Sequence, residues 1–534
     1  MSGFELLLER AAARRGESPA IHTEAGSVSW HELLRQVERV AGGMASLGIS
    51  LGDRVAFWLP NGLPYLVLHL ACARLGAVTV AINTRFRERE LADIVARSGA
   101  VALVLAPAAG GVDYLSVLGA TDARALGRLR HLILAGLGPA GRSRPSPLPA
   151  TGVVEYAALA DAAPWRLPPV PEDAPVALFT TSGTTARPKF ALHAQNRAVA
   201  HGADVARAFL YGEPGTVVFH ALPFCGVFGY SQLLGCLATS ADMVLPSAFD
   251  PIQAARMMAE HRVTHTSGTD DMLHRLLQAA DDLGLGERPF PRLRAIGYAA
   301  FNTTLARFHE TAARRGLPLR GAFGMSEAYS FFALRRADEP EGRRHAGGGT
   351  PVGLHGRVRI VDPDGGEEVP VGEPGALLIR SDNMMLGYDG DPEATKAAFT
   401  DDGWFRTGDL ARLDGDGGFT FIGRQGDVLR LSGFLVNPLE IEDRLCAYPG
   451  IDGAQVVELA TRAGNRPVAF VTLEAGAELD EAAAIAHCRD GLAAFKAPVR
   501  VVALEAFPTA MGPNGAKIQR AKLREMAKDL AGAG

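Results

Sequence analysis

Helical and strand patterns alternate along this chain almost from its first residues. Residues 29–32 read Ser-Trp-His-Glu, a capping box that opens an amphipathic pattern with Leu33, Leu34, Val37 and Val40 on one side. Short runs rich in aliphatic residues, such as 101–105 and 217–219, stand between patterns of this kind. Because parallel strands need crossover helices, this alternation predicts an α/β fold.

The later part of the chain changes character. After about residue 374, Gly- and Asp-rich turns such as 413–418 favour antiparallel hairpins, and from about 428 the patterns indicate a small α+β unit. Two stretches rich in Pro, Gly and Ser, 136–152 and 164–175, are expected to be surface connections. Since 534 residues exceed one ordinary core, we expect a large multi-subdomain N-terminal region with crossover α/β sheets plus a β-rich part, followed by a small α+β C-terminal domain.

Composition excludes some classes of partner. The net charge is −5 and the basic residues are scattered, so no basic stripe for nucleic acid is present. The first fifteen residues mix acids and arginines, unlike a secretory signal, so a cytoplasmic protein is expected. The most apolar segment, 63–82, is interrupted by His69 and Arg74, and we interpret it as a buried helix and strand rather than a membrane span.

The five cysteines have an odd number and irregular spacings. This pattern fits neither a disulfide framework nor a zinc site, so it predicts free or buried thiols.

The strongest chemical signal is a loop that follows an apolar strand pattern at 176–179. Residues 180–189 read Thr-Thr-Ser-Gly-Thr-Thr-Ala-Arg-Pro-Lys. Hydroxyls, small residues and a terminal Lys after a buried strand are what a loop needs to wrap a polyphosphate. An ordinary Ser/Thr-rich loop is the alternative.

Two acidic residues further along the chain add to this signal. Glu327 ends the segment Phe-Gly-Met-Ser-Glu at 323–327, and Asp409 ends Gly-Trp-Phe-Arg-Thr-Gly-Asp at 403–409. A single Glu can hold Mg²⁺ beside phosphates, and a single Asp can accept both ribose hydroxyls. Acidic residues in turns commonly only cap or face solvent, so each segment alone is a weak signal.

Together and in this order, the segments resemble the adenylate-forming superfamily of acyl-CoA synthetases, peptide-synthetase adenylation domains and beetle luciferases. The resemblance runs from 74–83 through the phosphate loop to Gly-Arg-Gln-Gly-Asp at 423–427 and Asn-Gly-Ala-Lys-Ile-Gln-Arg at 514–520. It implies an N-terminal AMP-binding domain, 1–425, and a mobile C-terminal domain, 426–534, which carries the catalytic Lys517.

The resemblance also implies a reaction and its residues. The carboxylate of an acid attacks the α-phosphate of ATP and expels pyrophosphate, which requires neutralised phosphate charge and aligned reactants. Lys517, Glu327, Ser326 and Lys189 match the catalytic residues, and Glu327 matches the Mg²⁺ ligand. The ATP contacts implied are Thr181, Ser182, Gly183, Thr184, Thr185, Lys189, Ala300, Phe301, Phe323, Gly324, Met325, Ser326, Asp409, Arg424 and Lys517.

The same resemblance implies a second half-reaction, in which the C-terminal domain swings about Gly426 and presents Ser432, Gly433 and Phe434 to a thiol. We expect this thiol to be coenzyme A, because no carrier domain follows the Lys517 motif. The alternatives are a separate carrier protein, a luciferase-like oxygenase, or a non-catalytic adenylate-binding relative. A homodimer is left open.

The chain shows four departures from the family pattern: Ala186 in the phosphate loop, the pair Ala299 and Ala300, Gly226, and Gly426. Ala186 replaces the usual Gly at an expected cost of about 1 kcal/mol if that position needs positive φ. None of the four removes a charged catalytic group, so the reaction class stands.

The expected acyl pocket is apolar and aromatic, as an acyl or aryl tail requires. Plain core packing is the alternative. Peptide-synthetase adenylation domains, which the chain resembles, place an Asp near the position of Phe224 to bind the substrate ammonium; this segment has none, so the resemblance does not imply an amino acid substrate. Asp270 and Asp271 are expected either to cap a helix or to bind a cationic tail. The pocket residues are Phe224, Cys225, Gly226, Phe228, Tyr230, Tyr298, Ala299 and Phe331.

Overall fold

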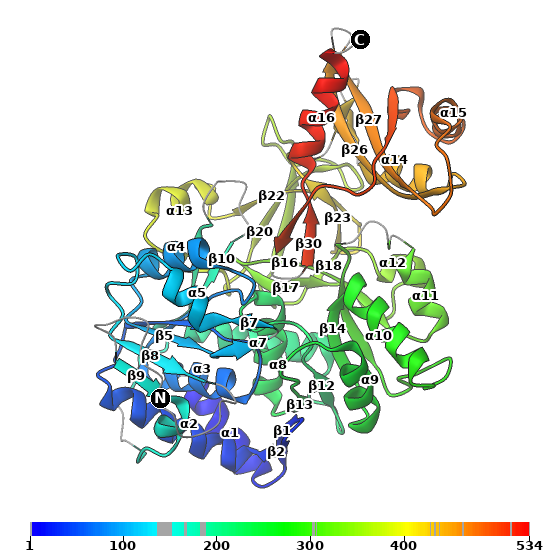
Figure 1. Ribbon diagram of the computed structural model, residues 1–534. Helices are drawn as coiled ribbons and strands as arrows, with labels where there is room; N and C mark the ends of the chain where they lie inside the picture. Colours follow the sequence, from blue (N-terminus) through cyan, green and yellow to red (C-terminus); the bar gives the residue numbers. More distant parts are fainter. Residues whose placement is uncertain are drawn as a thin grey trace.

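The computed structural model describes residues 3–109, 111–135, 152–164, 168–181, 188–301, 305, 307–427, 429–431, 434–436, 438–461, 464–512 and 515–532. Figure 1 shows a large N-terminal region, coloured blue to yellow, and a small C-terminal domain in orange and red above it. The expected α/β class, with a large region and a small domain, is confirmed. Most of the connection predicted at 136–152 lies outside the described residues, whereas part of 164–175 is described.

One sheet of eight strands forms the first lobe. Its strands are parallel from β10 to β9, whereas β11 and β21 join antiparallel at the edge. In order they are β21 (Gly387–Tyr388), β11 (Phe190–Ala194), β10 (Pro175–Thr180), β4 (Val78–Ala81), β3 (Arg54–Trp58), β5 (Ala102–Leu105), β8 (His131–Leu134) and β9 (Gly152–Glu155).

Both faces of this sheet are covered, which is why its central strands are continuous apolar runs. Along β3, Val55 and Phe57 enter one core while Ala56 and Trp58 enter another. The helices of this part are α1 (Gly3–Arg15), α2 (Trp30–Ser46), α3 (Leu63–Leu75), α4 (Glu88–Ser98), α5 (Tyr114–Ala120) and α6 (Tyr156–Ala160), and a small hairpin pairs β6 (Ala108–Ala109) with β7 (Val112–Asp113).

A continuous ladder of thirteen strands forms the rest of the large region. It is parallel from β1 to β16 and antiparallel on both sides of that block. In order the strands are β19 (Arg357–Val361), β20 (Gly375–Arg380), β22 (Phe405–Leu413), β23 (Phe419–Arg424), β18 (Gly348–Pro351), β17 (Tyr329–Leu334), β16 (Leu319–Met325), β15 (Ala295–Ala299), β14 (His265–Thr269), β12 (Val217–Phe219), β13 (Asp242–Val244), β1 (Pro19–Thr23) and β2 (Gly26–Ser29).

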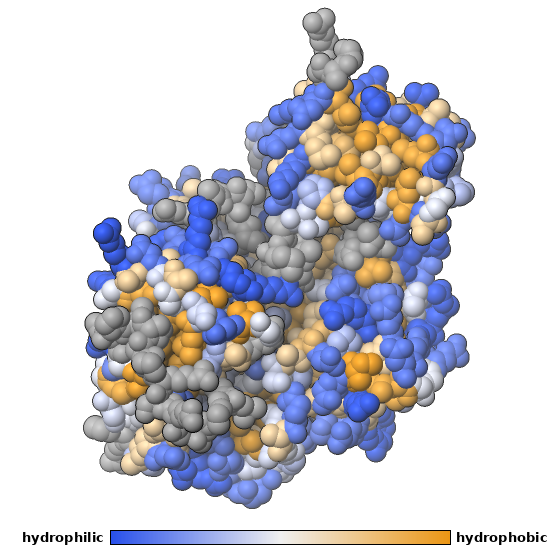
Figure 2. Space-filling view, in the orientation of Figure 1, coloured by the Kyte–Doolittle hydropathy of each residue, from blue (hydrophilic) through white to orange (hydrophobic). Residues whose placement is uncertain are grey.

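The hairpins expected after residue 374 are confirmed by the antiparallel pair β22 and β23, which are joined by a turn at 414–418. The helices that accompany this ladder are α7 (Gln195–Phe209), α8 (Val227–Thr239), α9 (Pro251–Glu260), α10 (Asp270–Asp282), α11 (Phe308–Arg314), α12 (Glu341–Arg344) and α13 (Pro392–Ala398). Figure 2 shows that this face of the molecule is hollowed between the lobe of the eight-stranded sheet and the lobe of α9 to α11.

The C-terminal domain has its own core, as the predicted α+β unit requires. Its central sheet pairs β26 with β27 antiparallel and β27 with β28 parallel. Its elements are β24 (Leu429–Leu431), β25 (Phe434–Val436), α14 (Pro438–Cys446), β26 (Ile451–Thr461), β27 (Gly464–Leu473), α15 (Glu481–Gly491), a short turn of helix (Ala494–Lys496), β28 (Arg500–Ala503), β29 (Thr509–Gly512), β30 (Gly515–Ile518) and α16 (Arg520–Gly532).

The structure also bears on the predicted capping box, the apolar segment 63–82 and the cysteines. Ser29 caps α2 by accepting a hydrogen bond from the Glu32 amide at 3.2 Å, but the Glu32 carboxylate binds Arg35 and Gln36. The apolar segment 63–82 is the buried helix α3 followed by β4, as expected. All five cysteines are free thiols. None of the helices in the described part of the chain is long and apolar enough to span a bilayer.

Candidate active site

The ends of the phosphate loop are joined where β10 ends and β11 begins. The Thr181 amide donates to the Lys189 carbonyl at 2.9 Å, and the Lys189 amide donates to Thr181 Oγ1 at 3.3 Å. These two hydrogen bonds hold the ends of the loop together at the carboxyl end of a parallel strand, where α/β folds bind ligands. Ser182, Gly183, Thr184, Thr185 and Ala186 lie outside the described residues.

Lys189 and Glu327 both contact Tyr388. The Lys189 ammonium is 4.7 Å from the centre of the Tyr388 ring, a cation–π contact. The Tyr388 hydroxyl donates to Glu327 Oε1 at 2.7 Å, and burial together with this carboxylate raises the pKa of Tyr388. The Tyr388 phenol therefore stays protonated and orients the carboxylate. The structure thus brings the expected phosphate and metal residues to one place.

Asp409 and Arg424 are register partners on β22 and β23. Arg424 Nη1 lies 3.1 Å from Asp409 Oδ1, yet this buried oxygen has no well-aligned hydrogen bond from the described residues. Burial raises the pKa of Asp409 to about 7, the Arg424 charge lowers it, and the Glu327 charge raises it further. A buried carboxylate short of donors is what two ribose hydroxyls would satisfy, so these residues fit a nucleotide.

The segment expected to enclose adenine is held by Asp270. Its Oδ2 accepts from the Phe301 amide and its Oδ1 from the Asp271 amide, both at 2.9 Å. Thr269, not Asp270, is the N-cap of α10. Asp270 therefore anchors the Ala299 to Phe301 segment, a role that neither helix capping nor cation binding predicted. Phe301 itself is partly exposed, at 40%.

Phe323 lies on β16, the strand that pairs with β15, which leads into this segment. Its ring packs edge-on against that of Phe419, with the ring centres 5.2 Å apart. It also contacts the ring of Phe421, with the centres 5.7 Å apart. A Cβ at Gly324 would lie 2.3 Å from backbone atoms of Ser330, so only glycine fits where the two arms of the β16–β17 hairpin approach.

Most residues of the expected acyl pocket share one core. Phe224, Cys225, Phe228, Tyr230 and Phe331 belong to it, and Ala299 packs against it. The Phe228 and Phe331 rings are 5.4 Å apart. Gly226 is the N-cap residue of α8, the helix that carries Phe228 and Tyr230. These residues are buried together, which fits both the expected pocket wall and the alternative of plain core packing.

Tyr298 does not join this core. Successive side chains of a strand point to opposite faces, and Tyr298 on β15 packs with Phe308 in a different core. The alternation along β15 thus separates Tyr298 from Ala299.

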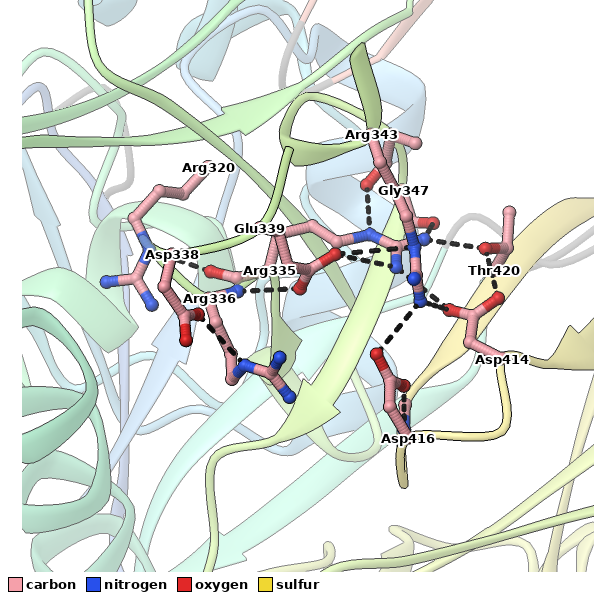
Figure 3. A network of polar contacts seen from close by, with 12 residues as sticks. Arg320, Arg335, Arg336, Asp338, Glu339, Arg343, Gly347, Asp414, Asp416 and Thr420 are labelled. Atoms are coloured by element: carbon pink, nitrogen blue, oxygen red, sulfur yellow. Dashed lines mark hydrogen bonds and ion pairs between the residues drawn. The ribbon is translucent and has the colours of Figure 1, made fainter. Parts of the chain in front are cut away.

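A buried ionic network lies between the end of β17 and the turn that joins β22 to β23 (Figure 3). The fully buried Arg335 pairs with Glu339 at 3.3 Å and Asp414 at 2.9 Å, and donates to Thr420 Oγ1 at 2.7 Å. Arg343 also pairs with Asp414, at 2.7 Å. The network ties the end of β17 to the β22–β23 turn. It therefore fixes the hairpin that carries Glu327 relative to the hairpin that carries Asp409.

Comparison with known proteins identifies the family. The family model of AMP-binding enzymes matches residues 8–389, and that of the AMP-binding enzyme C-terminal domain matches residues 440–510. The chain belongs to the AMP-binding enzymes. This confirms the expected adenylate-forming superfamily of acyl-CoA synthetases, and with it the reaction class, an AMP-forming acid–thiol ligase.

Curated relatives cover nearly the whole chain of this AMP-binding enzyme. It is 32% identical over 531 residues to 2-hydroxy-7-methoxy-5-methyl-1-naphthoate–CoA ligase of Streptomyces carzinostaticus, covering 97% of this chain and 92% of the relative. It is 30% identical over 510 residues to feruloyl-CoA synthase of an Amycolatopsis species, covering 94% of each. ATP-bound MatB of Rhodopseudomonas palustris superposes with a TM-score of 0.82 at 26% identity, covering 99% of this chain and 100% of MatB.

The C-terminal domain of this AMP-binding enzyme carries Lys517 on a hairpin. The backbone of Lys517 pairs with that of Ala510 between β30 and β29. Figure 1 shows the hairpin extending from the C-terminal domain in the direction of the large region. Arg520, at the start of α16, forms an ion pair with the buried Glu442 at 2.7 Å, which fixes the helix after the hairpin to α14. Ser432 and Gly433 lie outside the described residues, and Phe434 begins β25.

Sequence reasoning missed three residues of the site: Tyr388, His193 and Asp270 in its anchoring role. The Glu327 carboxylate that Tyr388 binds is 61 positions away in the chain. His193 Nε2 binds the carbonyl of Ser326, which is 133 positions away. No local motif marks contacts of this kind. The sequence indicates that Asp270 lies at a helix start. The Phe301 amide that it binds, however, follows the next strand of the sheet.

Proposed function

We propose that the protein uses Mg²⁺-ATP to activate a carboxylic acid whose aryl or acyl tail is apolar and uncharged, and that it then transfers the acyl group to coenzyme A. In the first step an acid oxygen bonds to the α-phosphorus and pyrophosphate leaves. In the second step the thiol sulfur bonds to the acyl carbon, AMP leaves, and the thiol proton passes to solvent. The observation that carries the proposal is the grouping of Lys189, Tyr388 and Glu327 beside the buried Asp409, which is paired with Arg424.

Each of these groups has a distinct task. Lys189 offers an ammonium to the phosphates, while Asp409 and Arg424 hold the ribose. Glu327 is oriented by the Tyr388 phenol and would hold Mg²⁺, which supplies charge neutralisation at the phosphates when bound. Lys517 would place a second ammonium between the acid and the α-phosphate. Positioning and electrostatic stabilisation account for most of the catalysis of phosphoryl chemistry of this kind.

The class of acid follows from the wall of the acyl pocket. Phe224, Phe228, Tyr230 and Phe331 offer rings, and the polar group of Tyr230 already binds His69 Nε2 at 3.1 Å. Asp270 binds backbone amides, which weakens the case for a cationic tail. Relatives named naphthoate–CoA ligase and feruloyl-CoA synthase act on aromatic acids, which supports the same class here.

The test is acid-dependent exchange of labelled pyrophosphate into ATP, measured without coenzyme A over a panel of aromatic, alkyl, amino and dicarboxylic acids. We expect the highest exchange with aromatic and apolar acids, and AMP release when coenzyme A is added. Release of ADP, or exchange without any acid, would contradict the proposed chemistry. Transfer to a phosphopantetheinylated carrier protein but not to coenzyme A would favour the carrier-loading alternative.

A further inference from the structure

The turn between β16 and β17 carries Glu327. Its backbone carbonyls accept hydrogen bonds from neighbouring segments of the chain. The Ser326 carbonyl accepts a hydrogen bond from His193 Nε2 at 2.7 Å, and the Glu327 carbonyl accepts one from the Met385 amide at 2.8 Å. His193 lies on β11, four residues after Lys189. The turn is therefore fastened directly to the strand that continues from the phosphate loop.

The protonation of His193 follows from its partner. A carbonyl oxygen only accepts, so Nε2 carries the proton, and burial lowers the pKa of His193 to about 4. In this neutral tautomer Nδ1 is an acceptor, and it is buried without a hydrogen bond from the described residues. An aliphatic side chain would be less costly at such a fully buried position. The imidazole is therefore best explained by the bond that it donates.

The residue after the turn is also constrained. Tyr329 has φ +60°, a left-handed conformation that is strained for a bulky residue. Its fully buried ring lies between two imidazoles, 4.2 Å from the centre of His193 and 4.5 Å from that of His201. His201 binds Ser231 Oγ, at 3.2 Å. Strained residues persist where their surroundings over-determine them, and here His193 contributes both a ring contact with Tyr329 and the hydrogen bond to the turn.

We propose that His193 is a positioning residue, whose Nε2–H bond to the Ser326 carbonyl sets the Glu327 carboxylate where Mg²⁺ and the phosphates of ATP require it. This inference rests on the proposed function. His193 touches neither nucleotide nor acid in the proposal. It acts by making the phosphate-loop strand and the Glu327 turn one rigid unit.

The experiment compares His193→Leu, which fills the space but donates nothing, with His193→Gln, whose side-chain amide can donate at a similar reach. His265→Leu is the matched control, because His265 is also a buried neutral histidine on a strand and bonds Thr264 instead. Calorimetry without any acid measures the affinity for Mg²⁺-ATP and, separately, for AMP. Thermal unfolding is recorded for each variant.

We expect His193→Leu to weaken Mg²⁺-ATP binding about tenfold, the scale of one well-made hydrogen bond. AMP binding should change far less, since Asp409 and Arg424 are not moved. His193→Gln should recover most of the loss, and His265→Leu should bind both nucleotides as wild type does. The ¹⁵N shifts of His193 in the wild type should show the neutral Nε2–H tautomer at pH 7.

Equal losses for ATP and AMP in both His193 variants, or no loss in either, would overturn the inference, because His193 would then be ordinary core. An Nδ1–H tautomer or an imidazolium in the wild type would also overturn it. A wild-type protein that binds neither nucleotide would contradict the proposed function itself, and the inference with it. Normal wild-type binding with an unaffected His193→Leu would leave the proposed function standing.

Discussion

The guanidinium of Arg524 donates hydrogen bonds to the carbonyl oxygen of Gly426 and to the carboxylate of Asp427. Arg524 lies on α16, the helix that follows the strand of Lys517, and Gly426 is the expected hinge. Because Arg520 fastens the same helix to Glu442, α16 connects the hinge to the body of the C-terminal domain. Any rotation about Gly426 must rearrange the bond to its carbonyl.

Arg524→Gln should therefore loosen the attachment of α16 to Gly426 and Asp427. If this arrangement is the one that adenylates, pyrophosphate exchange should fall several-fold, while thioester formation from synthetic acyl-adenylate should be unchanged or faster. Lys528→Gln is the control, since Lys528 is an exposed cation on the same helix. Equal losses in both half-reactions would mean that Arg524 only stabilises the helix.

Gly426 does not need to be glycine in this arrangement. A Cβ there would meet no atom within 4 Å, and its φ lies outside the left-handed region. Gly426→Ala should therefore leave adenylation intact, and any loss should appear in the thiol step, where the hinge takes another conformation. Gly426→Pro should slow the thiol step more strongly. Stopped-flow measurement of each half-reaction tests this, and an adenylation defect in Gly426→Ala would contradict it.

Asp409 should make stability depend on pH in a defined direction. Its folded pKa of about 7 lies above the ordinary Asp value of 3.8, mainly because of burial. The carboxyl thus ionises more easily in the unfolded chain, so its penalty grows as the pH rises from about 4 to 7 and is complete above 7. Asp409→Asn should melt higher than wild type at pH 8, with a smaller difference at pH 5. AMP should bind this variant about tenfold more weakly or worse. A larger melting difference at pH 5 would contradict the assignment.

The Arg335 network predicts a large loss of stability. Arg335→Met removes a fully buried cation and leaves the buried carboxylates of Glu339 and Asp414 short of a partner. Such a change costs about 3–5 kcal/mol, which denaturant unfolding can measure. Arg336→Met is the control, because Arg336 pairs with Asp338 at the surface and should change little. Equal effects of the two substitutions would contradict the role of the network.

The fold and the charged residues of the site could be predicted because each belongs to a contiguous pattern. Lys189 ends a loop that follows an apolar strand and Glu327 ends a short motif, so sequence order places both beside strand ends, whereas Asp409 ends a short motif but lies within β22. What could not be predicted is how these groups are held. Tyr388 and His193 act on residues that are distant in the chain, and their contacts depend on the pairing of β21 with β11 and on the fit between two sheets.

Tyr298 shows a different limit. The expected acyl pocket includes both Tyr298 and Ala299, yet neighbours on a strand face opposite ways. Period-two alternation over 295–299 could have indicated this separation. Its strand is buried on both faces, however, so the apolar pattern does not show which face is the pocket.

Lys517 is expected to act in only one of the two half-reactions, and its strand is fixed by its pairing with β29 and by the Arg520–Glu442 ion pair that follows. If its ammonium stabilises the oxyanions that meet during adenylation, Lys517→Ala should slow pyrophosphate exchange by about 10²-fold or more, the usual scale for one preorganised donor. Affinity for ATP should change far less. Thioester formation from synthetic acyl-adenylate should survive, since the expected rotation of the C-terminal domain removes Lys517 from the site before that step. Loss of both steps with a lowered melting temperature would make the lysine structural, and near-normal rates in both would make it a surface residue. Lys522→Ala, a change of the same kind at an exposed position on α16, should leave both half-reactions and the melting temperature unchanged.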